Sequence, residues 1–263
     1  MNGKMIFFDI DGTIATEGDH RISTSTRDAI RRARENGHLT FINTGRTFFT
    51  VTEEIRELGF DGYVCGCGTY VRLGEELLVS RSIPHETCVE IVGKLRECRV
   101  EAMFEGLTDV FFDGEEPATG VLASLKAKYG ARGYDITKTW DSPGIVFDKF
   151  VVWAKGDSDF EGFHDYITRE FTYIDRGGNF GEIIPKGFDK GTGIDVLRKH
   201  LGIRLEDCYA IGDSTNDLPM LEAVPNSIAM GNSMVEILDK VAFVTRDIEE
   251  DGIAHALEHF GII

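Results

Sequence analysis

The sequence predicts an α/β protein in which a doubly wound parallel sheet is interrupted by an inserted α+β domain. Three observations carry this prediction. Apolar runs alternate with helical segments over about the first 60 residues, the same alternation returns after residue 190, and the stretch between them has a mixed pattern. Strands that alternate with helices over short connections are typical of parallel sheets covered by helices. Strands grouped beside helices are typical of antiparallel α+β units.

The first elements follow from apolar runs and cap residues near the amino terminus. Residues 5–10 are an apolar run that ends at acidic residues, which is the pattern of a buried parallel strand and its exit loop. A helix follows that either Ser25 or Thr26 can cap. A second strand is expected over residues 39–43, and a second helix over about 49–58.

The alternation breaks after residue 63, where the pattern changes to paired strands and isolated helices. A hairpin is expected first, over residues 70–73 and 77–81. It is followed by a helix over 86–97, strands over 100–105 and 109–112, and a second helix over 118–129. The segment then continues with a strand over 147–154, a helix over 160–171 and a second hairpin over 172–176 and 180–184. Alternation resumes with helix 192–201, strand 208–211, helix 218–223, strand 227–230, helix 234–239 and a last helix near 253–260. The simplest interpretation is a Rossmann-like core of residues 1–82 and 187–263, interrupted by an α+β domain over 83–186, which is an ordinary domain size.

Composition and charge narrow the class of protein. The 263 residues include 28 Lys and Arg against 45 Asp and Glu, a formal net charge of −17, and 42% are hydrophobic. This composition is that of a globular protein, and the acidic balance argues against nucleic acid or an anionic membrane as a partner. Five cysteines without a C-x-x-C pair, and no apolar stretch of ~20 residues, favour a soluble protein in the reducing cytoplasm. We expect a monomer or a small homo-oligomer.

Two carboxylates follow the first predicted strand. Asp9 and Asp11 stand two residues apart in the segment Asp9–Thr13, which reads D-I-D-G-T. In doubly wound sheets ligands bind beyond the carboxyl ends of the strands, and residues i and i+2 of an extended segment point the same way. Adjacent carboxylates repel each other unless a cation is bound or one of them keeps its proton. The pair therefore predicts a metal ligand that can attack and a group that can carry a proton, against the simpler interpretation of a solvated acidic loop.

Two further segments could bind an anion. Asn43–Arg46, N-T-G-R, follows the second predicted strand, where a hydroxyl and backbone N–H groups near a helix start can cradle an anion. The same segment could be an ordinary cap and turn. Lys190 enters a helix, although the helix dipole favours anions at that end. A bound phosphate or an acidic partner would explain this lysine, and so would solvation, and Lys186 is a rival for the same role.

A second acidic cluster follows the strand predicted over residues 208–211. It is the segment Gly212–Asp217, which reads G-D-S-T-N-D. The carboxylate of Asp213 and the amide of Asn216 suit Mg²⁺, which is usually bound by one or two carboxylates together with water and substrate phosphate. Asp217 alone could be an ordinary helix N-cap.

Several other polar residues receive structural interpretations. His255 and His259 are spaced i, i+4 on the last predicted helix with no evident third ligand, so a surface pair is favoured over a zinc site. His20 stands alone in the sequence and is interpreted as a surface or cap residue. Cys65–Gly68, C-G-C-G, is interpreted as a tight loop between strands rather than a metal or redox site.

Together, these segments resemble the four motifs of the haloacid dehalogenase superfamily of phosphotransferases. Residues 7–13, Asn43–Arg46, Lys190 and Gly212–Asp217 match its first to fourth motifs in order. The long insertion between the second and third motifs is similar to the C2-type cap of this superfamily. The resemblance therefore implies a catalytic core and a cap formed by residues 83–186 that selects the substrate.

Two shorter segments, 228–232 and 250–254, are similar to the Cof-type subgroup of sugar-phosphate phosphatases. The chain departs from that subgroup at one place. After the third strand the subgroup usually has Asn-Gly-Ala, whereas this chain has Cys67–Thr69, C-G-T. That loop borders the substrate entrance in the subgroup, so the departure leaves the choice of substrate open.

The resemblance also implies roles for individual residues. Asp9 would be the nucleophile that forms an aspartyl-phosphate, and Asp11 would be the general acid and base. Mg²⁺ would be the cofactor, held by Asp9, the backbone carbonyl of Asp11 and Asp213. The other residues implied to act at the site are the phosphate-binding Ile10, Thr44, Gly45, Lys190 and Asn216, and the supporting Asp217 and Arg46.

These roles imply a Mg²⁺-dependent phosphatase for small phosphorylated metabolites, with sugar phosphates favoured. A phosphomutase or phosphotransferase would use the same Asp9 and differ only in the group that accepts the phosphoryl. From a different class, a receiver-like signalling module also combines acidic residues, a threonine and a lysine on an α/β sheet. The inserted domain and the second carboxylate at Asp11 argue against that alternative.

Overall fold

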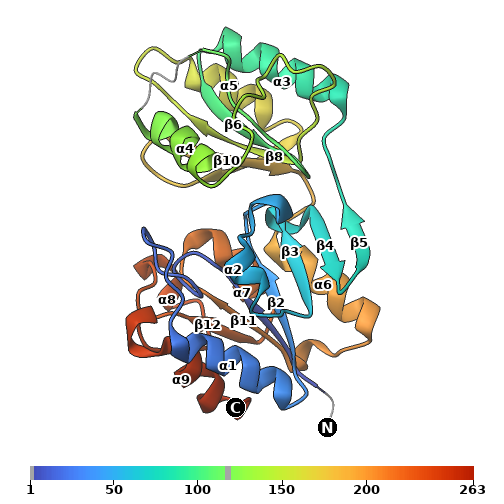
Figure 1. Ribbon diagram of the computed structural model, residues 1–263, viewed down its shortest axis with the longest axis vertical. Helices are drawn as coiled ribbons and strands as arrows, with labels where there is room; N and C mark the ends of the chain where they lie inside the picture. The colour runs from blue at the N-terminus through green and yellow to red at the C-terminus, as the bar shows by residue number, and fades with distance from the viewer. Residues whose placement is uncertain (1–2, 116–119) are drawn as a thin grey trace. The chain divides into compact units, whose positions relative to one another are not determined.

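The computed structural model describes residues 3–115 and 120–263 (Figure 1). It divides into two compact units: Met1–Ser80 with Phe188–Ile263, and the inserted unit Arg81–Gly187. The predicted division placed these boundaries at 82/83 and 186/187. Within the described residues, the chain contains no helix that is long and apolar enough to cross a membrane.

The first unit contains an eight-stranded sheet with the strand order β13-β12-β11-β1-β2-β3-β4-β5. Its strands are β1 (Met5–Phe8), β2 (Leu39–Asn43), β3 (Gly62–Cys65), β4 (Tyr70–Leu73), β5 (Glu76–Ser80), β11 (Cys208–Gly212), β12 (Asn226–Ala229) and β13 (Phe243–Val244). The strands from β13 to β3 pair in parallel, and β4 and β5 extend one edge as an antiparallel hairpin. The predicted α/β class with a mostly parallel sheet is therefore confirmed.

Helices cover both faces of this sheet (Figure 1). They are α1 (Thr24–Glu35), α2 (Glu53–Arg56), α6 (Lys190–Leu201), α7 (Leu218–Glu222), α8 (Val235–Leu238) and α9 (Gly252–His259), joined by the short 3₁₀ turns η1 (Phe48–Thr50), η2 (Gly66–Gly68), η3 (Leu205–Asp207), η4 (Thr215–Asp217) and η5 (Ile248–Glu250). Side chains of β1 alternate between two cores: Phe8 packs with residues of α1 and α9, whereas Phe7 packs with residues of α6 and α7. A strand buried on both faces explains why residues 5–8 are all apolar.

Two expected elements differ from the structure in detail. The first helix begins at Thr24 rather than after Ser25 or Thr26, because the Ser23 hydroxyl accepts the hydrogen bond from the Thr26 N–H and caps it. The single helix expected over 49–58 is instead η1 followed by the short α2, because the chain between them is extended at residues 51 and 52.

The inserted unit contains a five-stranded antiparallel sheet with the order β7-β6-β8-β10-β9. Its elements are α3 (His85–Glu97), β6 (Glu101–Glu105), β7 (Val110–Phe111), α4 (Gly120–Ala131), β8 (Lys149–Trp153), α5 (Phe160–Ile167), β9 (Phe171–Asp175) and β10 (Phe180–Pro185). Helices α3 and α5 share a core with Phe104 and Phe150, and α4 contributes Leu122 to a second cluster with Met103 and Val151. These pairs alternate along β6 and β8, so the helices cover opposite faces of the sheet. The first two residues of the helix predicted over 118–129 lie outside the described residues.

The order of the central strands brings the predicted motifs to one edge of the parallel sheet. Strand β1 lies between β11 and β2, with Phe8 in register with Ile211 and with Ile42. The chain leaves all three strands in the same direction, so the segments that follow them share the carboxyl edge of the sheet. Ligands bind at this edge in doubly wound folds.

Candidate active site

Asp9 lies directly after β1 and is held there by the neighbouring strand. Its backbone N–H donates a hydrogen bond to the carbonyl of Ile211 (3.0 Å), which extends the pairing of β1 with β11 by one residue. The side chain is buried, and one of its oxygens lies 2.7 Å from the Lys190 Nζ. The fold therefore fixes both the backbone and the carboxylate of this residue.

Lys190 is the first residue of α6 and is almost fully buried, with 1% of its surface exposed. A reciprocal capping box between Asp189 and Thr192 fixes the start of the helix, so the lysine enters the site from a rigid position. Its Nζ lies 2.7 Å from Asp9 Oδ1 and 2.5 Å from Asp217 Oδ1. Burial by itself lowers the pKa of Lys190, but the two carboxylates outweigh it and raise the pKa above its usual value. The lysine is therefore held in its charged form.

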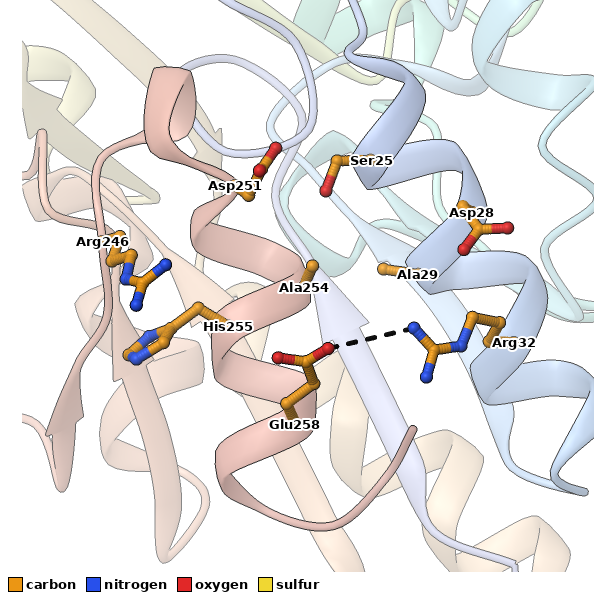
Figure 2. A pocket seen from close by; sticks show the side chains of 9 residues that line it. All are labelled: Ser25, Asp28, Ala29, Arg32, Arg246, Asp251, Ala254, His255 and Glu258. Carbon is orange, nitrogen blue, oxygen red and sulfur yellow. Dashed lines mark ion pairs between the residues drawn. The ribbon is translucent and has the colours of Figure 1, made fainter.

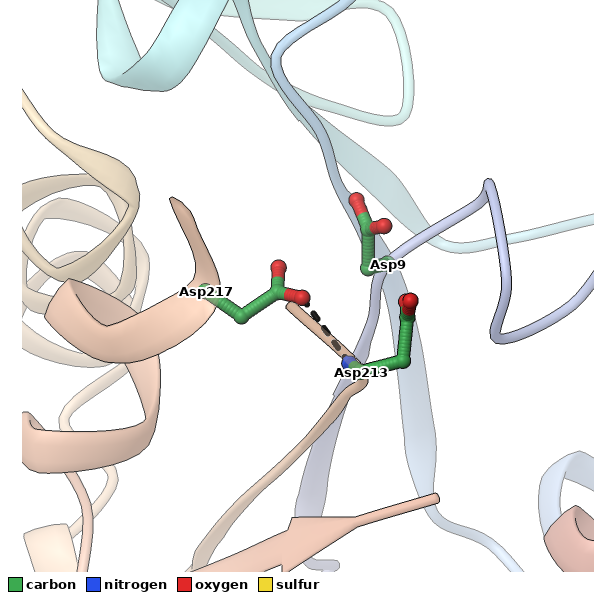
Figure 3. A group of neighbouring side chains, drawn as sticks. All are labelled: Asp9, Asp213 and Asp217. Carbon is green, nitrogen blue, oxygen red and sulfur yellow. Dashed lines mark hydrogen bonds between the residues drawn. The ribbon is translucent and has the colours of Figure 1, made fainter. Parts of the chain in front are cut away.

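Asp213 and Asp217 come from the turn after β11 and complete the cluster (Figure 3). Asp213 accepts a hydrogen bond from the Thr13 hydroxyl at 3.0 Å. One oxygen of Asp217 accepts bonds from the backbone N–H groups of Asp213 (2.9 Å) and Ser214 (3.0 Å). Because its other oxygen contacts Lys190, Asp217 is engaged on both sides.

A glycine is required where the two acidic segments meet. Gly12 has a φ of +81°, and a side chain there would collide with the carboxylate of Asp213. The close approach of the loop after β1 to the loop after β11 therefore depends on glycine at this position, for both backbone and steric reasons.

The carboxylates of Asp9, Asp213 and Asp217 offer oxygens that all lie within 4.8 Å of one another. Burial raises the pKa of Asp9 to about 7, and repulsion from Asp217 adds to this effect. Burial raises the pKa of Asp213 to about 8, with Asp9 and Asp217 again adding to it. Three buried carboxylates beside a single ammonium group form a hard oxygen site with excess negative charge, which fits a divalent cation such as Mg²⁺.

Asp11 points to a different partner from Asp9. Arg46 binds it in a bidentate manner, with Nε 2.8 Å from one carboxylate oxygen and Nη2 in contact with the other. Burial by itself raises the pKa of Asp11, but Arg46 reverses the effect and the net shift lowers it. The two aspartates of the D-x-D segment therefore have opposite pKa shifts, which favour the ionised form of Asp11 and, before a cation is bound, the protonated form of Asp9.

The other predicted phosphate-binding residues lie on the loops after the same strands. Thr44 follows β2; its backbone N–H donates to Val64 O (2.9 Å), and its hydroxyl accepts from the Arg46 N–H (3.2 Å). Asn216 lies in η4, and its side-chain oxygen accepts a hydrogen bond from the Ser214 hydroxyl at 2.5 Å. These contacts orient the loops rather than join Thr44 or Asn216 to the carboxylate cluster.

Three further predicted residues have clear positions. Ile10 is fully buried, so only its backbone could face a ligand. Gly45 lies between Thr44 and Arg46 and is half-buried. Lys186, the rival of Lys190, belongs to the inserted unit and donates to the carbonyl of Arg169 at 2.8 Å. Of the two lysines, Lys190 is therefore the one that belongs to this cluster.

The loop in which the sequence departs from the Cof-type pattern adjoins the start of α6. Cys67 has a left-handed backbone with φ of +52°, and Gly68 has φ of +90°. A side chain at Gly68 would collide with the backbone carbonyl of Asp189, the residue before Lys190. Residues 66–68 thus support the helix start that carries the lysine, and the expected tight loop is confirmed.

Sequence reasoning missed one residue of this region. His20, interpreted as an isolated surface or cap residue, has its Nδ1 3.4 Å from Asp11 Oδ1 and 3.5 Å from Arg46 Nη2. Nothing in the local pattern marks this contact, because His20 lies nine positions after Asp11 and the turn between them is irregular. Of the histidine pair on the last helix, His255 is half-buried and contacts the Thr245 hydroxyl (2.9 Å), whereas His259 is exposed and stacks on a phenylalanine.

A separate small pocket of about 220 Å³ lies between α1 and α9 (Figure 2). Its lining mixes basic and acidic side chains, and Arg32 lies 3.9 Å from Glu258 across it. The nine residues that line it are Ser25, Asp28, Ala29, Arg32, Arg246, Asp251, Ala254, His255 and Glu258. They do not include a residue of the carboxylate cluster, so the cluster and the pocket are different features of the unit.

Comparison with known proteins agrees with this geometry. The 5-amino-6-(5-phospho-D-ribitylamino)uracil phosphatase YwtE of Bacillus subtilis (strain 168) is 28% identical over 282 residues, which cover 97% of each chain. The HMP-PP phosphatase of Escherichia coli (strain K12 / DH10B) is 28% identical over 273 residues, 98% of this chain and 95% of that protein. A solved structure of the HAD subclass IIB sugar phosphatase BT4131 is similar with a TM-score of 0.82 and 28% identity, covering 99% of this chain and 100% of that one.

A family model gives the same result over almost the whole sequence. The model of haloacid dehalogenase-like hydrolases matches residues 6–257, a range that includes all four motifs and the inserted unit. The chain therefore belongs to the haloacid dehalogenase-like hydrolase family.

Proposed function

We propose that this protein is a Mg²⁺-dependent phosphatase that hydrolyses small phosphorylated metabolites, with sugar phosphates as the favoured substrates. The observation that carries the proposal is the pairing of two aspartates with opposite environments. Asp9 is buried beside Lys190 and two further carboxylates, and Asp11 is bound by Arg46. A nucleophile and a proton carrier two residues apart are what hydrolysis through a covalent phospho-enzyme requires.

In the first step a carboxylate oxygen of Asp9 forms a bond to phosphorus while the bond from phosphorus to the leaving oxygen breaks. Asp11 gives a proton to that leaving oxygen, so the product departs as an alcohol. Because Arg46 lowers the pKa of Asp11, the carboxylate has to take up this proton from solvent before the step. In the second step Asp11 removes a proton from water, the water oxygen bonds to phosphorus, and the bond to Asp9 breaks. The enzyme returns to its starting state, and one water is consumed for each phosphate released.

Positive charge and donors are needed where negative charge gathers during these steps. Lys190 is charged and within hydrogen-bond distance of the attacking residue, so it can bind a phosphoryl oxygen beside Asp9. We assign the same task to the hydroxyl of Thr44, the backbone N–H groups of Ile10 and Gly45, and the amide of Asn216. Asp217 supports Lys190, because it contacts the ammonium group while its other oxygen is held by two backbone N–H groups.

A divalent cation fits the excess negative charge of the cluster. Asp9, Asp213 and the backbone carbonyl of Asp11 would hold it, since both oxygens of Asp217 are already engaged, one by Lys190 and the other by two backbone N–H groups. When bound, Mg²⁺ neutralises the repulsion between the carboxylates and the phosphate and favours the ionised form of Asp9. The raised pKa values of Asp9 and Asp213 support this proposal, because they show that the ionised cluster is unfavourable without added positive charge.

The substrate class is proposed from the similar proteins together with the fold. The relatives described above are phosphatases of small phosphorylated compounds by name, and the structure at 28% identity is that of a sugar phosphatase. We propose that the inserted unit, residues 83–186 in the predicted division, is a cap that selects the leaving group. We also propose a reducing, cytoplasmic location, which is supported by five cysteines that are all buried thiols.

Phosphate release from a panel of sugar phosphates and from p-nitrophenyl phosphate tests the proposal. We expect release that needs Mg²⁺, stops on chelation, and falls at least about a thousandfold in Asp9→Asn. Asp28→Asn, an exposed aspartate on α1, is the matched control and should keep wild-type activity. Full activity in Asp9→Asn would show that Asp9 is not the nucleophile. Transfer of the phosphoryl group to a second sugar without release would favour the phosphomutase or phosphotransferase alternative.

A further inference from the structure

The carboxylate of Asp11 has two neighbours, Arg46 and His20, and His20 has no part in the mechanism described so far. Arg46 contacts both of its oxygens, as described above. His20 completes the arrangement, with Nδ1 3.4 Å from Asp11 Oδ1 and 3.5 Å from Arg46 Nη2. Because the same Nδ1 atom faces both partners, it either donates to Asp11 Oδ1 or accepts from Arg46 Nη2, according to which ring nitrogen carries the hydrogen.

The backbone that carries His20 is held in an unusual conformation. Its φ is +55°, a left-handed value that costs a residue with a side chain on the order of 1 kcal/mol or more relative to glycine. The turn around it is closed by the bonds from the His20 N–H to Thr16 O (3.2 Å) and from Thr16 N–H to Arg21 O (3.0 Å). Arg21 is bound in turn by both oxygens of Glu249 at 2.6 Å. The fold thus holds a bulky residue at a position that suits glycine, and directs its ring to Asp11.

Asp11 needs this support more than Asp9 does. Its side chain is 41% exposed, whereas Asp9 is buried among other groups. Arg46 restrains this half-exposed carboxylate, but each orientation that the pair samples by rotation away from the leaving oxygen reduces proton transfer. A second contact on Oδ1 restricts this rotation beyond what the guanidinium achieves alone.

We propose that His20 is a positioning residue for the general acid and base, and that it holds the Asp11–Arg46 pair in the orientation needed for proton transfer to the leaving oxygen. The proposal rests on the proposed phosphatase function. His20 itself does not contact the phosphoryl group in this role. Its importance therefore depends on the leaving group: it is large for an alkoxide, which must be protonated as it departs, and small for p-nitrophenolate, which is a weak base and departs without a proton.

The leaving group therefore provides the test. His20→Gly removes the ring and relieves the left-handed backbone, so the turn is expected to persist. His20→Asn is the conservative variant, because asparagine tolerates the same backbone and offers an amide near the position of Nδ1. His200→Ala, which removes a histidine paired with Glu76 on the same unit, is the matched control. Each variant is assayed in Mg²⁺ with a hexose phosphate and with p-nitrophenyl phosphate, beside Asp11→Asn as the reference for loss of the acid.

We expect His20→Gly to lower kcat for the hexose phosphate about tenfold, a fraction of the roughly 10²–10⁴-fold that general acid–base catalysis contributes. Its kcat for p-nitrophenyl phosphate should change less than about twofold, with both KM values retained, and His20→Asn should recover most of the loss. Equal losses on both substrates, or no loss on the hexose phosphate, would overturn the proposed role of His20 but would leave the proposed phosphatase function standing. A wild-type protein that releases phosphate from neither ester would overturn the proposed function and this inference with it.

Discussion

Each of the two units buries a lysine among carboxylates, but they do so in different parts of their sheets. In the first unit, Lys190 meets Asp9 and Asp217, which lie on segments that follow the ends of β1 and β11. In the inserted unit, Lys149 on β8 meets Glu105 on β6, with its Nζ 3.7 Å away, and also contacts Glu182 on β10. The first cluster is assembled beyond the strands, whereas the second lies within three neighbouring strands.

This difference indicates two uses of buried charge. Glu105 and Lys149 are directly opposite each other in the antiparallel register, so their pairing depends on the correct alignment of β6 with β8. A shift by one residue would move one of them to the other face and leave a buried charge without its partner. The cluster around Lys190 aligns no strands, and its excess of carboxylates is suited to a cation and a phosphate. Variants of Lys149 and Lys190 can therefore distinguish a buried charge that aligns strands from one that serves the proposed reaction.

The largest expected effect is the loss of either lysine. Lys190→Met and Lys149→Met should each lower the free energy of unfolding by about 3–5 kcal/mol, because each leaves carboxylates buried without their cation. Only Lys190→Met should also lower kcat by about a hundredfold or more under conditions in which the variant stays folded. Urea unfolding and phosphate release measure the two quantities on the same samples. A folded Lys149→Met variant without activity would contradict the division of roles.

The second largest expected effect is that Mg²⁺ stabilises the protein through the cluster around Lys190 and not through the cluster around Lys149. At a concentration of 100 times its Kd, Mg²⁺ should stabilise the wild-type protein by about 2.7 kcal/mol through binding to the folded state alone. Asp213→Asn should lose most of this gain, whereas Glu105→Gln in the inserted unit should retain it. Thermal unfolding with and without Mg²⁺ gives the values. An equal stabilisation of both variants by Mg²⁺ would show that the cation does not bind at Asp213.

The last expected effect is a pH dependence of stability that belongs to the inserted unit. Burial raises the pKa of Asp148 from 3.8 to about 6, although its hydrogen bond from the Ser82 hydroxyl opposes the shift. The folded state therefore holds this proton more tightly than the unfolded state does. The contribution of Asp148 to the free energy of unfolding is greatest below about pH 4, falls as the pH rises to about 6, and is constant above that.

Asp148→Asn keeps the neutral form at every pH, so it should become more stable than the wild-type protein by up to about 3 kcal/mol at pH 7 and similar to it at pH 4. Asp175→Asn, an exposed aspartate of the same unit, is the control and should show no such trend. Urea midpoints across this pH range measure the difference. A constant difference between pH 4 and pH 7 would show that Asp148 titrates as an exposed carboxyl.

Much of the fold was predictable because its signals are local. Apolar runs ending in acidic residues identified β1 and β11, and the break in the alternation indicated the inserted unit. Prediction was weaker where the elements were short, since the helix expected over 49–58 is divided by two extended residues. The buried set of Glu105, Lys149 and Glu182 gave no sequence signal, because charged residues within strands resemble those of a solvated face.

The sequence by itself determined which chemical groups follow the central strands, because the D-x-D-G-T, N-T-G-R and G-D-S-T-N-D segments are each continuous in the chain. Only the tertiary structure decided which of these groups meet. It brings Lys190 to Asp9 across 181 residues, binds Lys186 to a carbonyl of its own unit, and turns Asp11 from its neighbour toward Arg46 and His20. The physical reason is that contacts between distant segments depend on strand order, on helix caps and on turns held in left-handed conformations. Those features arise only when the chain has folded.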